Sequence, residues 1–214
     1  LIDQADTLGP GPTAPSKEIF EDALSQAKVI VKLGQTITNI TARSVTLNTG
    51  EEIETASVIV TTGLRANPLA ELINLELDPT GRLMVDGSLR VKGIKNIFAA
   101  GDIAAAYTDE THLAAMSCQH AMPMGAHAGY NAARSLLSLP HRKYAQPDYR
   151  TCIDLGESGA LLTSGWDRIP EKSGSEVKAI KYKINQEMIY PPEGNDEQIM
   201  AFSHVDAQWV DSRE

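Results

Sequence analysis

The stretch Asn96-Ile97-Phe98-Ala99-Ala100-Gly101-Asp102 sets the expectation for the fold. Its apolar residues favour a buried strand that breaks at Gly101, where the missing Cβ lets the backbone turn tightly or approach a ligand closely. Asp102 follows at the carboxyl end of that strand, which is the edge where open α/β sheets bind their ligands. An ordinary strand end has the same pattern, so a binding site needs support from the rest of the chain.

A second apolar strand ends in the same way. The run 53–60 leads into Thr61, Thr62 and Gly63. Before it, strands are predicted at 36–40 and 45–47, with a hairpin turn at 48–51 where Gly50 is available for positive φ. This pattern predicts a small antiparallel piece attached to an α/β layer.

The first forty residues predict a β-α-β-like unit. The opening residues resemble the tail of a strand that Asp3 closes, and 9–12 reads as a Gly-Pro loop. Apolar residues recur at spacings of three and four over 16–27, which indicates an amphipathic helix. The run 29–33 then reads as a short buried strand that ends at a glycine.

The second half of the chain predicts a long helix followed by a small α+β unit. The helix covers 113–139, and Pro123 inside it cannot donate to the carbonyl of Gln119, so we expect a kink or a late start there. After Pro140 the composition shifts. Strands are expected at 149–155 and 160–163, and a helix from 174 until Pro191 and Pro192 stop it, followed by a weakly patterned acidic tail.

Composition excludes several classes of function. The 214 residues carry 19 Lys and Arg against 28 Asp and Glu, a net charge of −9, which argues against a nucleic-acid surface. Cys118 and Cys152 have neither CxxC nor metal-ligand spacing, so we expect a reducing, cytoplasmic location and no metal site. No apolar run approaches the roughly 20 residues that span a bilayer.

From 53 to about 139 the chain resembles the second half of the FAD-dependent pyridine nucleotide-disulfide oxidoreductases, with type II NADH dehydrogenase-like flavoproteins the closest likeness. Val60-Thr61-Thr62-Gly63 is similar to that family's return from its NADH domain to its FAD domain, and 96–102 to its final FAD-binding strand. The resemblance implies an α/β fold of two dinucleotide-binding domains with antiparallel crossover strands. Residues 1–62 would be the second half of the NAD(P)H-binding domain, 63–140 the end of the FAD-binding domain, and 141–214 a small C-terminal α+β interface domain.

The same resemblance assigns cofactor-binding roles. Asp102 would hydrogen-bond the ribityl chain of FAD, and Gly101 would allow the close approach. The segment Ser117, Cys118 and Gln119 falls where the family aims helix N-terminal amides at the flavin, with Gln119 at a position that touches the flavin ring. Thr62 and Gly63 lie at the domain return. An acid such as Asp3 accepts hydrogen bonds from the NADH ribose and disfavours a 2′-phosphate.

The chain also departs from the family pattern. It contains no GxGxxG, whereas the family needs one such loop for FAD and another for NADH, so we expect a fragment whose phosphate loops precede Leu1. It has no redox CxxC. Its acidic tail differs from the basic, aromatic segment that seats type II enzymes on membranes, so a membrane partner and a quinone acceptor are not expected.

These observations predict the C-terminal half of a soluble FAD-dependent NAD(P)H oxidoreductase. Hydride would pass from the nicotinamide to the flavin, and then electrons to an acceptor that the sequence does not identify. The alternative is a non-catalytic truncated piece, or an oligomerisation module built on the hairpin at Cys152 and the helix at 174–191, without a bound cofactor; a homo-oligomer would form through this C-terminal domain. A third option is a disulfide reductase that uses Cys118 with a partner thiol.

Overall fold

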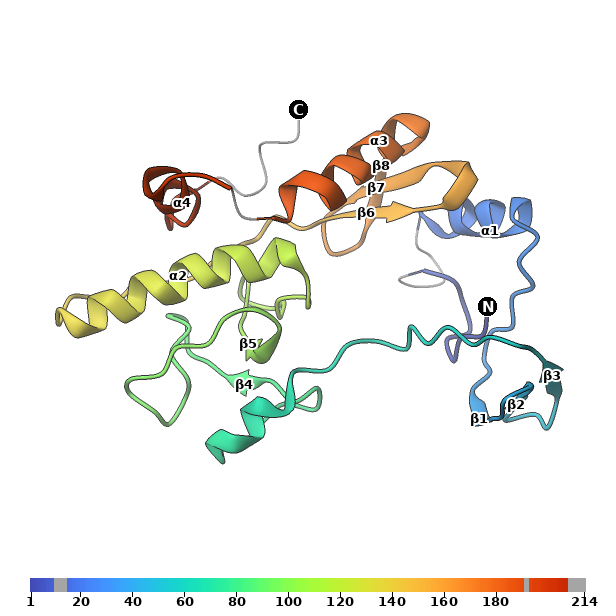
Figure 1. Ribbon diagram of the computed structural model, residues 1–214, viewed down its shortest axis with the longest axis horizontal. Helices are drawn as coiled ribbons and strands as arrows, with labels where there is room; N and C mark the ends of the chain where they lie inside the picture. Colours follow the sequence, from blue (N-terminus) through green and yellow to red (C-terminus); the bar gives the residue numbers. More distant parts are fainter. Residues whose placement is uncertain (10–14, 191–192, 208–214) are drawn as a thin grey trace. The chain divides into compact units, whose positions relative to one another are not determined.

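The computed structural model describes residues 1–9, 15–190 and 193–207. The chain forms two compact units (Figure 1): unit 1 contains residues 1–61 and 148–187, and unit 2 contains residues 62–147 and those from 188 onward. The predicted Gly-Pro loop, the Pro191-Pro192 stop and the end of the acidic tail fall wholly or partly outside the described residues.

The first part of unit 1 has the predicted helix and hairpins. Helix α1 spans Lys17–Gln26. Strands β1 (Ile37–Ile40), β2 (Ser44–Leu47) and β3 (Glu52–Glu54) form an antiparallel sheet in the order β1-β2-β3. The β2-β3 turn uses Gly50 at φ +85°, which confirms the predicted hairpin.

The second part of unit 1 is an antiparallel sheet covered by a helix. Strands β6 (Arg150–Asp154), β7 (Ala160–Ser164) and β8 (Ile169–Gly174) lie in that order, and β6 and β7 form the predicted hairpin. Strand β8 was not predicted from the sequence. Helix α3 (Ser175–Lys183) continues into a π-helical turn, Ile184–Met188, and buries Val177 against the sheet.

Two strands predicted in unit 1 differ from the prediction: one is not formed in the described residues and the other is shorter. The run 29–33 contributes only a parallel bridge between Lys32 and Ile2. The strand predicted at 53–60 ends at Glu54, and Ile59 is 89 % exposed. Strands are stabilised by cross-strand partners, and none pairs with residues 58–60 in the described part of the chain. Apolar composition alone therefore overstated strand content.

Unit 2 is a mixed unit built around one long helix. A 3-10 helix, Pro68–Ile73, precedes the strands β4 (Leu83–Met84) and β5 (Ala104–Ala105), which pair in parallel. Helix α2 spans Cys118–Leu136, and α4 spans Asp196–Phe202. The apolar core of the unit comprises Ala70, Leu83, Val85, Leu89, Val91, Ala99, Ala104, Ala106, Ala114, Met124, Ala128 and Tyr144.

The central strand predicted at 96–101 is wrong as a continuous strand. Only Phe98 bridges to Arg90, and Gly101–Ile103 forms a 3-10 turn. The positive φ of Gly101 ends extended backbone at that point, and β5 begins only after the turn.

Helix α2 also starts later than predicted. Residues 113–117 lie before it, because the segment pairs backward with the chain around β5: Ala114 donates to the carbonyl of Ala106, and Leu113 bridges to Tyr107. Of the two outcomes expected from Pro123, a kink or a late start, the structure has a start at Cys118, five residues after the predicted 113. Among the described residues, no helix has the length and apolar content needed to cross a membrane.

Candidate functional site

The turn at Gly101 packs against the start of helix α2. Gly101 has φ +72°, a region that residues with a side chain rarely adopt. A Cβ placed on it would lie 3.5 Å from the Cβ of Ala121, in ordinary van der Waals contact. Glycine is therefore required here by backbone conformation rather than by lack of space. The next residue, Asp102, is exposed, so its carboxylate is available to solvent or to a ligand.

The start of α2 presents backbone amides beside this turn. Ser117 is the N-cap in extended conformation, and its carbonyl accepts from the amides of His120 and Ala121. The first amides of any helix lack intrahelical partners and lie at the positive end of its dipole. Cys118 is exposed and Gln119 is half-buried in this first turn. The turn that carries the exposed Asp102 thus packs against the first turns of α2.

His120 closes the inner side of the helix start, and the sequence reasoning did not assign it a role. Its Nδ1 lies 2.9 Å from Oγ of Ser117, and its ring is buried. Burial lowers the pKa of His120 because the charged form is poorly solvated there. The neutral ring therefore fixes the Ser117 hydroxyl rather than adding charge to the site.

Two amide side chains hold α2 in place, and neither was predicted. Gln146 donates from Nε2 to the carbonyl of Gln119, at 2.9 Å. Asn131 is fully buried, donates to the carbonyls of Ser88 and Arg142, and accepts from the amide of Arg142. The signal that could have led to Gln146 was Pro123, which leaves the carbonyl of Gln119 without its usual helical donor.

The remaining predicted site residues are not part of this cluster. Asp3 belongs to unit 1, where its Oδ1 accepts from the amide of Ala5 at 2.9 Å. Thr62 and Gly63 are exposed at the start of unit 2, with Gly63 at φ +106° and open space where a Cβ would lie. Their roles in cofactor binding stay predictions.

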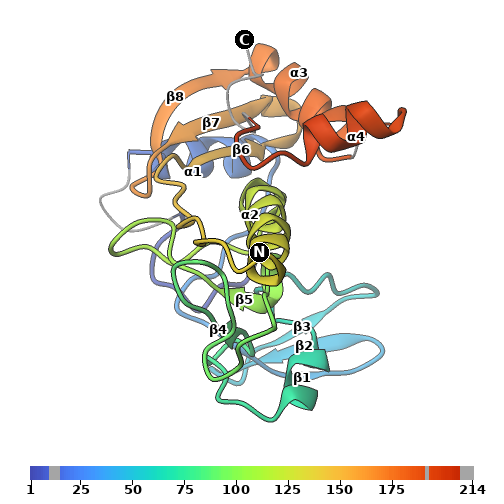
Figure 2. The same cartoon turned by 90° about the vertical axis from the view of Figure 1, so that its left-hand side faces the viewer.

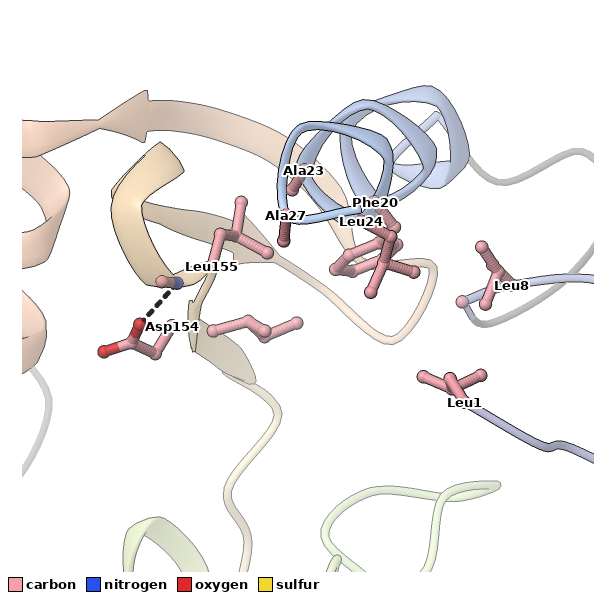
Figure 3. A pocket seen from close by; sticks show the side chains of 11 residues that line it. Leu1, Leu8, Phe20, Ala23, Leu24, Ala27, Asp154 and Leu155 are labelled. Atoms are coloured by element: carbon pink, nitrogen blue, oxygen red, sulfur yellow. Dashed lines mark hydrogen bonds between the residues drawn. The ribbon is translucent and has the colours of Figure 1, made fainter. Parts of the chain in front are cut away.

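A separate apolar cavity lies in unit 1. It has a volume of about 470 Å³ and lies between α1 and the β6-β7 connection. Figure 3 shows Phe20, Leu24 and Leu155 around it, with Leu1 and Leu8 at one side. Among the described residues of its lining, Asp154 carries a charged side chain, which pairs with Nζ of Lys178 at 2.7 Å. None of the predicted site residues lines this cavity, and the described residues hold no His, Cys, Asp or Glu cluster suited to a metal ion.

Comparison with known proteins gives the same family as the motifs. The family model for pyridine nucleotide-disulphide oxidoreductases matches residues 1–125. An NADH dehydrogenase-like protein of Mycobacterium tuberculosis is 40 % identical over 192 residues, which is 90 % of this chain and 48 % of the relative. The demethylphylloquinone reductase of Synechocystis is 29 % identical over 69 % of the chain and 37 % of the relative. The chain spans about half the length, or less, of these curated relatives.

Solved structures show the same fold. The water-forming NADH oxidase of Lactobacillus brevis matches 77 % of this chain and 36 % of its own, with a TM-score of 0.62 and 24 % identity. The sulfide:quinone oxidoreductase of Aquifex aeolicus matches 97 % of this chain and 51 % of its own, with a TM-score of 0.66 and 15 % identity. By its family match and by its sequence relatives, the chain belongs to the pyridine nucleotide-disulphide oxidoreductases.

Proposed function

We propose that the chain is part of an FAD-dependent NAD(P)H oxidoreductase of the NADH dehydrogenase-like type, and that unit 2 contributes one side of its flavin site. The observation that carries the proposal is the contact between the Gly101 turn and Ala121 at the start of α2. Through this contact a turn that carries an exposed acid packs against a helix start from another segment of the chain.

The donor set of this surface fits the chemistry of a flavin nucleotide. The carboxylate of Asp102 can accept hydrogen bonds from the hydroxyls of a ribityl chain, as carboxylates are acceptors when ionised. The amides around Cys118 and Gln119 can donate to the ring's carbonyl oxygens, and the helix dipole favours negative charge there. The bound flavin would supply hydride acceptance and onward electron transfer, whereas these protein groups bind and orient it.

The side chains around the helix start then have positioning roles. Ser117 and His120 hold the first turn in shape through their hydrogen bond of 2.9 Å. Gln146 holds the same turn through the carbonyl of Gln119. We infer that Thr62, Gly63 and Asp3 act at the domain return and at the nicotinamide ribose in the complete protein.

Flavin retention tests this proposal directly. The purified 214-residue chain, and the complete protein to which it belongs, are incubated with FAD, desalted and examined by visible absorption. We expect Asp102→Ala to reduce the retained flavin in the complete protein while leaving its circular dichroism unchanged. Glu110→Gln is the matched control, since Glu110 is an exposed acid in the same unit. Equal flavin retention by the Asp102 variant and the control would reject the site.

The non-catalytic alternative has less support. An oligomerisation module would need the apolar face of α3 to be free for a partner. Instead Val177 is buried, and Ile180 and Ile184 are half-buried, within unit 1. This favours ordinary packing of α3 on its own sheet.

The reductase option that uses Cys118 remains testable. If alkylation of the exposed Cys118 in the complete protein leaves NADH-driven turnover unchanged, the reductase option is excluded. A loss of turnover that Cys118→Ser does not reproduce would point instead to steric interference by the added group at the helix start.

A further inference from the structure

The residues 195–207, here called the strap, lie beside the outer face of α2 in unit 2 (Figure 2). The strap contains α4, which begins with a capping box: Asn195 accepts from the amide of Gln198, and Gln198 accepts from the amide of Asn195. Further backbone hydrogen bonds, such as Ser203 to Ile199 and Ala207 to His204, also stay within the strap. The hydrogen bonds that shape the strap are thus local ones, made within its own residues.

Apolar packing and an exposed ion pair attach the strap to the body of unit 2. Val205 is buried, at 7 % exposure. Asp206 pairs with Arg142 through Oδ1 and Nη2 at 2.5 Å, with about half of each side chain exposed. Exposed ion pairs contribute little to stability and weaken as salt rises. A short segment whose hold on the unit includes an exposed ion pair can open locally without unfolding the unit.

A groove of about 550 Å³ lies between the strap and α2. Met122, Gly125 and Gly129 line its inner wall, and Met200, Phe202 and Val205 line its outer wall. The wall on the α2 side begins at Ala121, which also contacts the turn at Gly101. The strap thus covers the part of α2 that continues from the candidate site.

We propose that the strap is a latched cover, held closed by the Arg142–Asp206 ion pair, whose opening exposes the α2 face from Ala121 to Ala133. If the proposed function holds, this movement controls access to the side of α2 that adjoins the flavin. The movement itself is a property of unit 2 and does not depend on a bound cofactor.

Methionine oxidation by dilute peroxide reports the opening in the chain as it is. Met122 lies half-buried on the covered face, whereas Met124 is buried in the core and does not line the groove. Oxidation follows exposure of the thioether. We expect Arg142→Gln to raise the oxidation rate of Met122 by about two- to fivefold, because the loss of an exposed ion pair increases the open population by about that factor. The oxidation rate of Met124 should stay unchanged. Arg43→Gln, which removes an exposed cation in unit 1, is the control and should change neither rate.

Two further variants keep the proposal falsifiable. The exchange Arg142→Asp with Asp206→Arg should restore the slow oxidation of Met122, because it rebuilds the pair with reversed charges. Val205→Ser should raise Met122 oxidation by itself, and high salt should raise it in the original chain but not in Arg142→Gln. Unchanged Met122 oxidation in both single variants, or an equal rise at Met124, would overturn the latch. Hydrogen exchange over 195–207 should increase together with Met122 oxidation.

These readouts require no flavin, so they separate the two proposals. A chain that opens as described but retains no flavin would support the strap and count against the flavin site. A chain that retains flavin but whose strap never opens would support the flavin site and count against the strap.

Discussion

Gln146 supplies the hydrogen bond that Pro123 removes from helix α2. Pro123 has no amide hydrogen, so it cannot donate to the carbonyl of Gln119 four residues earlier. The Nε2 of Gln146 donates to that carbonyl at 2.9 Å, and its Oε1 accepts from the hydroxyl of Tyr144 at 2.9 Å. Gln146 and Tyr144 are both buried, so the protein itself, and not water, supplies the donor to the Gln119 carbonyl. A side chain from the segment after α2 thus completes the part of the helix that borders the candidate site.

Gln146→Ala should destabilise the protein by about 1–3 kcal/mol, because it leaves the Gln119 carbonyl and the Tyr144 hydroxyl without partners in a buried site. Urea unfolding followed by circular dichroism measures the change. Gln4→Ala, an exposed glutamine in unit 1, is the control and should have little effect. In a Pro123→Ala background, the new amide can donate to the Gln119 carbonyl, so the cost of Gln146→Ala should fall. A cost that is independent of residue 123 would contradict the assigned hydrogen bond.

A second prediction concerns Asn131, which holds α2 to neighbouring segments by hydrogen bonds. Its side chain joins the carbonyl of Ser88 and both backbone groups of Arg142, through three hydrogen bonds of 2.8 to 2.9 Å. Asn131→Ala should lower the free energy of unfolding by about 1–3 kcal/mol, since it leaves partly buried backbone groups unpaired. Asn185→Ala, at an exposed position, is the control. A stability within error of the original chain would show that water replaces the amide.

Asp78 should make unit 2 sensitive to acid. Burial raises its pKa, but hydrogen bonds from the amide and guanidinium of Arg82 and from Thr80 outweigh it and lower the pKa to about 2. Arg82 also donates to the carbonyl of Ala114, just before α2. Since the folded-state pKa lies below the unfolded value of about 3.9, the ionised carboxylate stabilises the fold above that pH. This contribution is lost as pH falls from about 4 towards 2.

The comparison of Asp78→Asn with the original chain measures this contribution. We expect Asp78→Asn to be less stable by about 1–2 kcal/mol at neutral pH, and the difference to shrink as pH falls through the window. Glu76→Gln, a neighbouring exposed acid, should show neither effect. A difference that stays constant down to pH of about 2 would mean that Asp78 acts through packing rather than charge.

Local patterns in the sequence predicted the elements that are stabilised locally. Helix α1 follows from apolar spacing, and the β2-β3 hairpin follows from the glycine that its turn requires. The β6-β7 hairpin follows from the two short strands expected at 149–155 and 160–163. Strands at 58–60 and 96–101 were wrong because a strand exists only with a partner, and apolar composition does not reveal the partner.

The candidate site was predicted in its local parts. The glycine and acid at 101–102 and the helix start at 117–119 were expected as separate motifs, and the turn at Gly101 and the first turns of α2 meet through Ala121. The supporting residues could not be predicted in this way. Pro123 indicated that the Gln119 carbonyl needed a donor, but the donor, Gln146, is 27 residues away and is identified only by tertiary structure.

Two glycines of unit 2 should respond to alanine in opposite directions. Gly101 has φ +72°, so Gly101→Ala should destabilise the protein by about 1–2 kcal/mol through backbone strain. Gly125 lies inside α2, and a Cβ there would meet nothing within 4 Å. Gly125→Ala should therefore stabilise by about 0.5–1 kcal/mol, because alanine loses less conformational entropy in a helix. Thermal and urea unfolding of both variants measure the two signs. A stabilising Gly101→Ala would mean that the turn relaxes out of its positive φ, and with it the orientation of Asp102 that the flavin site requires.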